Sequence, residues 1–498
     1  MMAARGCIAV IDIGSNSLRL VVYDGIGRAP LALFNEKVLC GLGRGLGRSG
    51  RLNPDAIAPA LDNLQRFVAL ARAVGVIRLD IIATAAVRDA SDGAQFVAEA
   101  TRRCGVPVNI LDGGAEGRLS ALGVVAGIPQ ADGVVGDLGG GSVELIPVDL
   151  GQVGEGPSLP LGPLRLAEYS DDEKRLREIV DRHIASIPWL RRYRGRSFYL
   201  VGGAWRALAR IHMDQVKYPL HIIQNYVVPR GDAEQIFRFI SRLSRKSLEK
   251  IASVSKKRIE AVPLAAFVLS RIVDAIAPER LVFSAYGLRE GHLYDLLPES
   301  ERKQDPLLVA CATIAGTSPR FGITGDELFG WTTSLFPGED ARRRRLRLAV
   351  SLLSDTAWNE HPDYRADEAF MRGLRLPFAG IDHSERVFIA TALHARYGGP
   401  TDAEVKEPTR RLIGEADHAT ARAIGLTLRL GYTLSGGAPD VLSHTSLALR
   451  EGEVTLHAPA DDPLWSGETV QRRLDAVGRV FDRRAVIRLD GKRLAARA

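Results

Sequence analysis

Residues 10–21 read VIDIGSNSLRLV and residues 135–146 read VGDLGGGSVELI, so one pattern occurs twice without a gap. Each copy has an apolar run, an aspartate, a turn of glycine with small hydroxyl or amide residues, and then an alternating strand. Glycine in such a turn lets backbone N–H groups approach an anion, because it has no side chain and adopts unusual φ angles. Two such turns facing each other would hold a phosphate chain from both sides. The repeat therefore predicts two β-hairpins with phosphate-binding loops.

The repeat also indicates two α/β halves in the first part of the chain. After the first hairpin, the pattern predicts helices at 53–74, 93–104 and 116–126 and strands at 79–84 and 107–111. After the second hairpin, it predicts strands at 197–201 and 280–284 and helices at 205–212, 232–246, 257–276 and 288–297. Strands that alternate with helices are typical of α/β layers. We therefore expect α/β domains at 1–125 and 126–303, with a cleft between the two glycine turns.

The pattern changes after residues 298–301. Residues 305–430 are mainly amphipathic helix. The tail alternates between strands and one helix, predicted at 446–450, 454–457, 467–481 and 485–489. We expect a mainly helical domain at 304–435 and a small α+β unit at 436–498.

The composition is that of a globular protein, with 46% hydrophobic and 25% charged residues among 498. No apolar run approaches the roughly 20 residues that cross a bilayer. The four cysteines show no paired spacing of the kind that binds metals. The sequence therefore indicates a cytoplasmic protein with reduced cysteines and no membrane partner.

A net charge of +7 leaves nucleic acid, an anionic membrane surface or a polyanionic substrate as partners. Basic clusters occur at 191–196 and 342–345, with a further arginine at 347. Neither cluster is interleaved with aromatic residues in the manner of a nucleic-acid stacking platform. We expect a polyanionic substrate and no nucleic acid.

The two turns resemble the phosphate loops of the actin, hexokinase and chaperone-ATPase superfamily. Within it, the chain resembles the exopolyphosphatase and guanosine pentaphosphate phosphohydrolase (Ppx/GppA) family, and exopolyphosphatase most of all. The motifs ATAAVRDA at 83–90, GGAWR at 202–206 and YGLREG at 286–291 stand in that family's order and spacing. The resemblance implies two actin-like (ribonuclease H-like) α/β domains with a central cleft, then an HD-like helical domain. It also implies a homodimer.

The resemblance further implies Mg²⁺-dependent removal of terminal phosphate from inorganic polyphosphate. Glu116 matches the family's catalytic glutamate, which would activate water; otherwise it is a first-turn residue that favours the helix dipole. The family usually has acidic residues just before this position, where Gly114 and Ala115 stand here. That difference puts metal binding near Glu116 in doubt, but not the base itself.

Asp137 and Glu144 are expected to act in catalysis and, with Asp12, to hold Mg²⁺; otherwise they are ordinary turn and strand residues. The expected phosphate-binding residues are Gly14, Ser15, Asn16, Ser17, Arg19, Arg88, Gly139, Gly140, Gly141 and Ser142. The expected polyphosphate track consists of Arg342, Arg343, Arg344 and Arg345.

Three other positions are interpreted as structural. Gly202 and Gly203 resemble the superfamily's adenosine motif, but bulky Trp205 follows them, so we expect a structural turn. The helical domain reads LSD at 353–355, where family members can carry a His-Asp metal pair. We therefore expect Asp355 to be structural, and Asp382–His383 to form a satisfied turn.

Other functions stay open at this point. The substrate could be guanosine pentaphosphate (pppGpp), hydrolysed by the same chemistry. A sugar or acid kinase would need a base pocket and a hydroxyl-activating aspartate, neither of which the sequence identifies. The reduced acidic cluster before Glu116 also allows a regulator that binds polyphosphate or an alarmone without catalysis.

Overall fold

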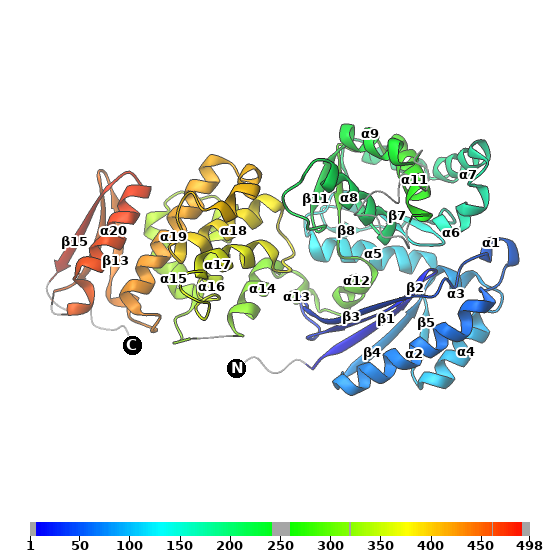
Figure 1. Cartoon of the computed structure of the whole chain (residues 1–498), viewed down its shortest axis with the longest axis horizontal. Helices are drawn as coiled ribbons and strands as arrows, with labels where there is room; N and C mark the ends of the chain where they lie inside the picture. The colour runs from blue at the N-terminus through cyan, green and yellow to red at the C-terminus, as the bar shows by residue number, and fades with distance from the viewer. Residues whose placement is uncertain (1–5, 242–258, 318–319, 461, 491–498) are drawn as a thin grey trace. The chain divides into compact units, whose positions relative to one another are not determined.

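The computed structural model describes residues 6–241, 259–317, 320–460 and 462–490. The chain forms two compact units, Met1–Gln304 and Asp305–Ala498, called unit 1 and unit 2 below (Figure 1). The parts of the predicted helices that fall in residues 242–258 lie outside the described residues.

Unit 1 contains two mixed β-sheets. The first has the strand order β3-β2-β1-β4-β5. Its strands are β1 (Ile8–Ile13), β2 (Ser17–Tyr23), β3 (Ala32–Leu39), β4 (Arg78–Ala83) and β5 (Val108–Ile110). The second has the order β11-β12-β10-β6-β7-β8, and β9 pairs with β7. Its strands are β6 (Gly133–Leu138), β7 (Val143–Asp149), β8 (Gln152–Val153), β9 (Ser158–Leu159), β10 (Ser197–Val201), β11 (Tyr226–Pro229) and β12 (Arg280–Phe283).

The strand registers confirm the predicted duplication. Strands β1 and β2 form an antiparallel hairpin in which Asp12 lies opposite Arg19. Strands β6 and β7 form a matching hairpin in which Asp137 lies opposite Glu144. On the other side of each hairpin, β1 pairs in parallel with β4, and β6 pairs in parallel with β10. The two halves therefore share one topology, as the α/β prediction required.

The helices of unit 1 follow capping and burial signals that are local in the sequence. They are α1 (Leu46–Ser49), α2 (Pro54–Val74), α3 (Ala85–Asp89), α4 (Gly93–Cys104), α5 (Gly113–Gly127), α6 (Pro163–Leu166), η1 (Ala167–Tyr169), α7 (Glu173–Ala185), η2 (Pro188–Tyr193), α8 (Gly203–Gln215), α9 (Arg230–Ser241), α11 (Ala261–Ile276), α12 (Leu288–Asp295) and α13 (Glu299–Arg302). Helix α2 shows the pattern: Asn53 caps its start and Gly75 ends it in the left-handed region. Its inward face packs Leu64 and Phe67 on the first sheet.

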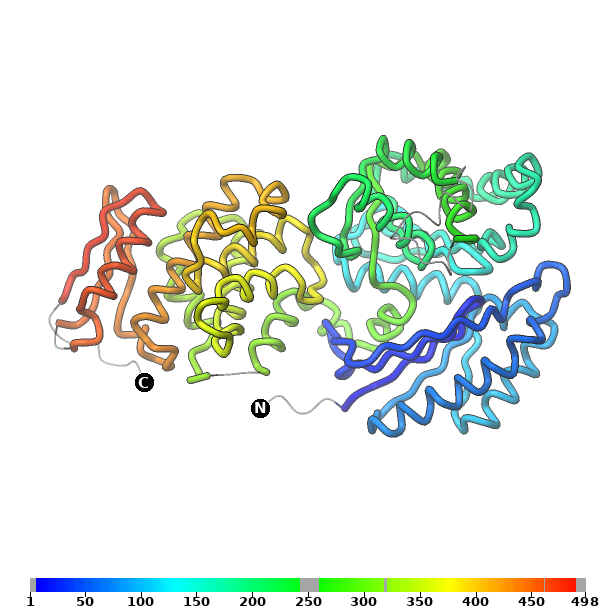
Figure 2. Tube along the Cα trace, in the orientation of Figure 1, coloured from blue at the N-terminus to red at the C-terminus, as the bar shows by residue number. Residues whose placement is uncertain are grey.

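Helices α5 and α12 interlock the two halves of unit 1. Helix α5 precedes the second hairpin in sequence, yet Val124 packs with Val135 of the second sheet. Helix α12 follows the strands of the second sheet in sequence, yet Leu293 packs with Val10 of the first sheet. The helices touch closely, because a Cβ atom on Gly291 would overlap the backbone of Leu119. Figure 2 shows α5 in cyan running between the blue and green parts of unit 1.

Unit 2 consists of helices followed by a small sheet. Its helices are α14 (Pro306–Ala315), α15 (Gly325–Thr332), η4 (Thr333–Leu335), α16 (Ala341–Leu353), α17 (Arg365–Arg375), α18 (His383–Arg396), η5 (Glu404–Leu412), α19 (Glu415–Ser435), η6 (Leu442–His444), η7 (Pro463–Trp465) and α20 (Glu468–Val480). Its sheet is β13 (Ser446–Arg450), β14 (Glu453–Pro459) and β15 (Arg484–Asp490), in that order. Helix α18 is buried along almost its whole length and forms the centre of the helical part. Among the described helices of the chain, none is long and apolar enough to cross a membrane.

Candidate active site

Both hairpin turns open into one cleft of ≈ 530 Å³ in unit 1. The starts of α5, α8 and α12 complete its walls. The predicted site residues that line it are Asp12, Gly14, Ser15, Asn16, Ser17, Arg19, Glu116, Asp137, Gly139, Gly140 and Ser142. Of the residues predicted for catalysis, metal binding or the phosphate loops, Arg88, Gly141 and Glu144 do not line it.

The two turns have the same geometry and lie against each other. The N–H group of Gly14 donates to the carbonyl of Ser17 at 3.0 Å. The N–H group of Gly139 donates to the carbonyl of Ser142, also at 3.0 Å. A Cβ atom on Gly140 would lie 3.1 Å from the Cβ of Ser15. A side chain at position 140 would therefore crowd the opposite turn, which explains why both loops are built from small residues.

Glu116 stands in the first turn of α5, which Asp112 caps. The Glu116 side chain is buried, and its Oε2 accepts a hydrogen bond from Nη1 of Arg88 at 2.7 Å. Burial raises the pKa of Glu116 to about 7, opposed by Arg88 and assisted by the nearby charges of Asp137 and Asp12. A carboxylate with a pKa near neutrality is well matched to general base catalysis at physiological pH.

Asp137 and Glu144 add two more carboxylates beside Glu116. Oδ2 of Asp137 accepts a hydrogen bond from the hydroxyl of Ser120 on α5, and burial raises the Asp137 pKa. Oε1 of Glu144 accepts from Ser158 at 2.6 Å, whereas Oε2 is buried without a hydrogen bond to any described residue. Burial raises the pKa of Glu144 well above its usual range, and the charges of Glu116 and Asp137 raise it further. Close like charges of this kind favour a cation between them.

The carboxylates of Asp12, Asp137 and Glu144 differ in how well they meet the requirements of Mg²⁺. Within the described part of the chain, no group of three or more His, Cys, Asp or Glu side chains is placed to hold a metal ion by itself. Mg²⁺ is commonly held by one or two carboxylates together with water and substrate phosphates. Asp137 lines the cleft and Glu144, its partner across the hairpin, has an oxygen without a hydrogen bond to a described residue, so the chemistry of these two carboxylates is compatible with such a shared ion. Asp12 differs, because its Oδ2 already accepts from Nη1 of Arg289 at 2.7 Å.

Two cleft arginines had no role assigned from the sequence, although both stand in the quoted motifs. Arg206 follows GGAW, lines the cleft and donates from Nε to the carbonyl of Ser284 at 2.8 Å. Arg289 stands in YGLREG and pairs with Asp12. Burial lowers the pKa of Arg206 to about 10, so its guanidinium still carries a charge at neutral pH. The signal that could have identified Arg206 and Arg289 as phosphate-binding candidates is an arginine that closely follows loop glycines.

Arg19 is a third cation on this wall. It lines the cleft, and its Nε donates to Oδ1 of Asn35 at 2.8 Å. Burial and the neighbouring Arg289 lower its pKa. Arg19 takes the place that Glu144 has in the other hairpin, so the duplicated hairpins carry a basic residue and an acidic residue at equivalent positions.

Arg88 belongs to a chain of ion pairs that joins the two halves. Its Nη1 donates to Glu116, and its Nε donates to Oδ1 of Asp89 at 3.1 Å. The other oxygen of Asp89 accepts from Nη2 of Arg165 on α6. Helix α6 is tied to the second turn, because the N–H of Leu164 donates to the carbonyl of Gly140 at 2.9 Å. The orientation of Glu116 is thus linked to the position of the opposite turn.

The remaining motif residues have structural contacts. Gly202 has a φ of 107°, and a Cβ there would overlap the backbone of Leu138. Trp205 is buried and donates from its indole to the carbonyl of Ala265 at 3.0 Å. In unit 2, Asp355 accepts two hydrogen bonds from Arg320, and Asp382 caps α18. These contacts agree with the structural interpretation of Asp355 and Asp382, whereas Gly202 and Gly203 also line the cleft, so their interpretation as a purely structural turn stays a prediction.

The arginine run at 342–345 is held by contacts within unit 2. Its partners are Glu385 and Asp417 for Arg342, Asp417 and Asp340 for Arg343, the ring of Phe329 for Arg344, and Asp305 and Glu385 for Arg345. Ion pairs of this kind neutralise a basic surface. The polyphosphate track along this run stays a prediction, without support from these contacts.

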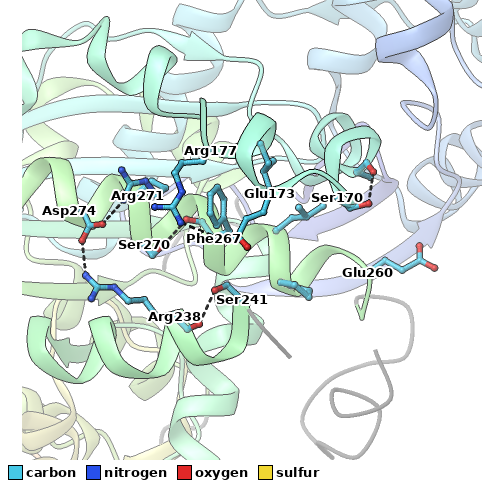
Figure 3. Close-up of a pocket in the computed structure, with 14 residues that line it drawn as sticks. Ser170, Glu173, Arg177, Arg238, Ser241, Glu260, Phe267, Ser270, Arg271 and Asp274 are labelled. Carbon is cyan, nitrogen blue, oxygen red and sulfur yellow. Dashed lines mark hydrogen bonds and ion pairs between the residues drawn. The ribbon is translucent and has the colours of Figure 1, made fainter. Parts of the chain in front are cut away.

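A larger cavity of ≈ 860 Å³ also occurs in unit 1, between α7, α9 and α11. Figure 3 shows Asp274 between Arg271 and Arg238, to which it is paired. Arg271 also binds Asp181 through two hydrogen bonds. Arg238 and Arg271 of this cavity thus already have carboxylate partners, whereas the described hydrogen bonds of Arg206 in the cleft go to backbone carbonyls.

Comparison with known proteins gives the family. Residues 20–300 match the model described as Ppx/GppA phosphatase family, which covers more than half of the chain. The chain belongs to the Ppx/GppA phosphatase family. Residues 307–487 match a second model, described as exopolyphosphatase, C-terminal. The family predicted from the two hairpins and the three motifs is therefore confirmed.

Among curated relatives of this Ppx/GppA chain, retrograde regulation protein 2 of Saccharomyces cerevisiae is 26% identical over 488 residues, covering 88% of this chain and 82% of the relative. Exopolyphosphatase 1 of Mycobacterium bovis is 27% identical over 301 residues, covering 57% of this chain and 86% of the relative. The crystal structure of an exopolyphosphatase from Cytophaga hutchinsonii matches with a TM-score of 0.53 at 24% identity, covering 58% of this chain and 97% of that chain. This last likeness, at under 25% identity, shows the fold alone.

Proposed function

We propose that this Ppx/GppA chain is an exopolyphosphatase, which hydrolyses the terminal phosphoanhydride of inorganic polyphosphate and releases orthophosphate. The observation that supports this most is Glu116, a buried carboxylate with a pKa of about 7 at the wall of a cleft between two glycine turns. Phosphoanhydride hydrolysis needs a held phosphate, a positioned water and a base. The cleft has a candidate for each.

In the proposed mechanism, backbone N–H groups of the turns at 14–17 and 139–142 bind the terminal phosphate from two sides. Arg19, Arg206 and Arg289 face the same cleft and offset the charge of the phosphate chain. Glu116 takes a proton from the attacking water as the water oxygen bonds to phosphorus. The bond to the bridging oxygen breaks, and the shortened chain leaves with that oxygen.

Mg²⁺ is part of the proposal, with Asp137 and Glu144 as the residues that would hold it. When bound, the ion would neutralise phosphate oxygens. Arg88 has a positioning role, because it holds Glu116 through a 2.7 Å hydrogen bond and links it to Asp89. pppGpp is the alternative substrate for the same chemistry.

A non-catalytic regulator is the second candidate, and one observation favours it. The relative matched over 88% of this chain is named for regulation, whereas the exopolyphosphatase relative matches over 57%. A regulator could use the same cleft to bind a polyanion without hydrolysing it.

One assay separates these functions. Purified protein is incubated with long-chain polyphosphate or pppGpp, with and without Mg²⁺, and orthophosphate release is measured beside equilibrium binding. Release from polyphosphate that exceeds release from pppGpp and that requires Mg²⁺ is the expected result. Binding without release from either substrate would favour the regulator. A protein that neither binds nor hydrolyses either substrate would exclude both functions.

A further inference from the structure

A separate cavity of ≈ 460 Å³ lies in unit 2, among residues that no motif of the sequence singled out. It is formed by η5, the first half of α19 and the end of α20. Its inner wall carries four basic side chains, Lys406, Arg410, His418 and Arg422. The apolar residues that line it are small or aliphatic, such as Ala419 and Val480, and no Phe, Tyr or Trp lines it among the described residues.

Lys406 is buried at the centre of this group. Its Nζ donates to the carbonyl of Pro400 at 2.7 Å and to that of Thr401, and it forms no ion pair with a described carboxylate. Carbonyl oxygens accept hydrogen bonds from this ammonium group without neutralising its charge, and the carboxylates of Asp402 and Asp367 act on it only through their charge, without an ion pair. Burial and the neighbouring Arg422 lower the pKa of Lys406 accordingly.

His418 and Arg422 stand one turn apart on α19 and face the same cavity. Within the described residues, neither side chain has a hydrogen-bond or ion-pair partner that would neutralise it. Burial lowers the pKa of His418 to about 4, and the charges of Arg410, Arg422 and Lys406 contribute. The cavity wall thus brings the charges of Lys406 and Arg422 together with hydrogen-bond donors of His418 and Arg422 that no described residue uses.

The acidic residues of this cavity lie at its rim. Asp402, Glu407 and Glu415 are exposed, and Glu415 is already paired with Arg410. Exposed carboxylates are screened by water and compensate buried cations poorly. An anion inside the cavity would meet the buried ammonium of Lys406 and the half-buried guanidinium of Arg422 in a lower dielectric than bulk water, where the attraction is stronger.

We propose that this cavity is a second anion site, which binds a short inorganic phosphate such as orthophosphate or pyrophosphate on Lys406, His418 and Arg422. Arginine, lysine and histidine all donate hydrogen bonds to phosphate oxygens. Among the described lining residues there is no Phe, Tyr or Trp on which a nucleobase would stack, and this favours a ligand without a base. The site lies wholly in unit 2, so it does not depend on the function proposed for the cleft.

The test follows His418 directly, because the cleft also binds phosphates. The full chain with the Glu116→Gln change and ¹³C-labelled histidine is titrated with orthophosphate and, separately, with pyrophosphate. The imidazole resonance of His418, assigned with His418→Gln, is expected to shift and saturate with at least one of them. The ligand with the lower Kd shows whether the site suits a single or a condensed phosphate.

Variants locate the site. Arg422→Met is expected to raise the Kd read from His418 by about tenfold or more, because it removes a charged hydrogen bond to the anion. Arg472→Met, a change at an exposed arginine of α20, is the matched control and should leave that Kd unchanged. Lys406→Met should act like Arg422→Met, and thermal unfolding shows whether either variant is folded. A His418 resonance that ignores both phosphates, or an equal Kd in Arg422→Met and Arg472→Met, would overturn the proposal.

Discussion

Glu116 is the residue on which the proposed chemistry depends. Replacing Glu116 by Gln keeps the shape and a hydrogen-bond acceptor for Arg88 but removes the ability to take a proton. We expect orthophosphate release from polyphosphate to fall by about 10²–10⁴-fold while polyphosphate binding persists. The control is Glu99→Gln, since Glu99 bonds arginines on the exposed surface of α4. Rates close to those of the unchanged protein would contradict the role of Glu116 as base.

The pH dependence follows from the same residue. Because the base must be ionised and the pKa of Glu116 is about 7, kcat/KM should rise with pH through about 7 and then level off. Arg88 lowers this pKa, so Arg88→Gln should move the midpoint to higher pH. The measurement is a pH profile of phosphate release for both proteins, with Arg102→Gln as an exposed arginine control. A midpoint that stays in place in Arg88→Gln would show that another group is titrating.

At the scale of elements, the close approach of α6 to the second turn positions that turn. A Cβ atom on Gly162 would overlap the backbone of Gly140 and Gly141. Gly162→Ala should therefore lower the free energy of unfolding by about 1–3 kcal/mol and displace the turn. Phosphate release should then fall by more than the loss of folded protein alone explains. Gly231→Ala is the matched control, because nothing lies within 4 Å of its Cβ position. Chemical denaturation and kcat, measured on both variants, check the prediction; equal values in the two would contradict it.

The elements also show where local sequence signals are sufficient. The hairpins β1–β2 and β6–β7 were predictable, because alternation and glycine turns depend on neighbouring residues. The packing of α5 on the second sheet was not, because its sequence is apolar over most of its length and does not indicate which sheet it covers.

At the scale of the whole molecule, every candidate catalytic residue lies in unit 1. The contacts described for Glu116, Asp137 and Arg289 all stay within that unit. We therefore expect residues 1–304, expressed alone, to fold and to retain phosphate binding in the cleft. Circular dichroism, cooperative thermal unfolding and equilibrium binding of pyrophosphate are the measurements. An unfolded product, or a folded one without binding, would show that unit 2 contributes to the cleft.

The sequence by itself determined the family, the α/β class, the two phosphate turns and the identity of Glu116 as the candidate base. Those features rest on short motifs and local periodicity, which any stretch of chain carries with it. Only the tertiary structure decided which charges meet. Arg289 reaches Asp12 across 277 positions, and Arg165 reaches Asp89 across 76. Such pairs form because packed sheets and helices bring distant residues together, and this is why Asp12 binds an arginine in the folded chain.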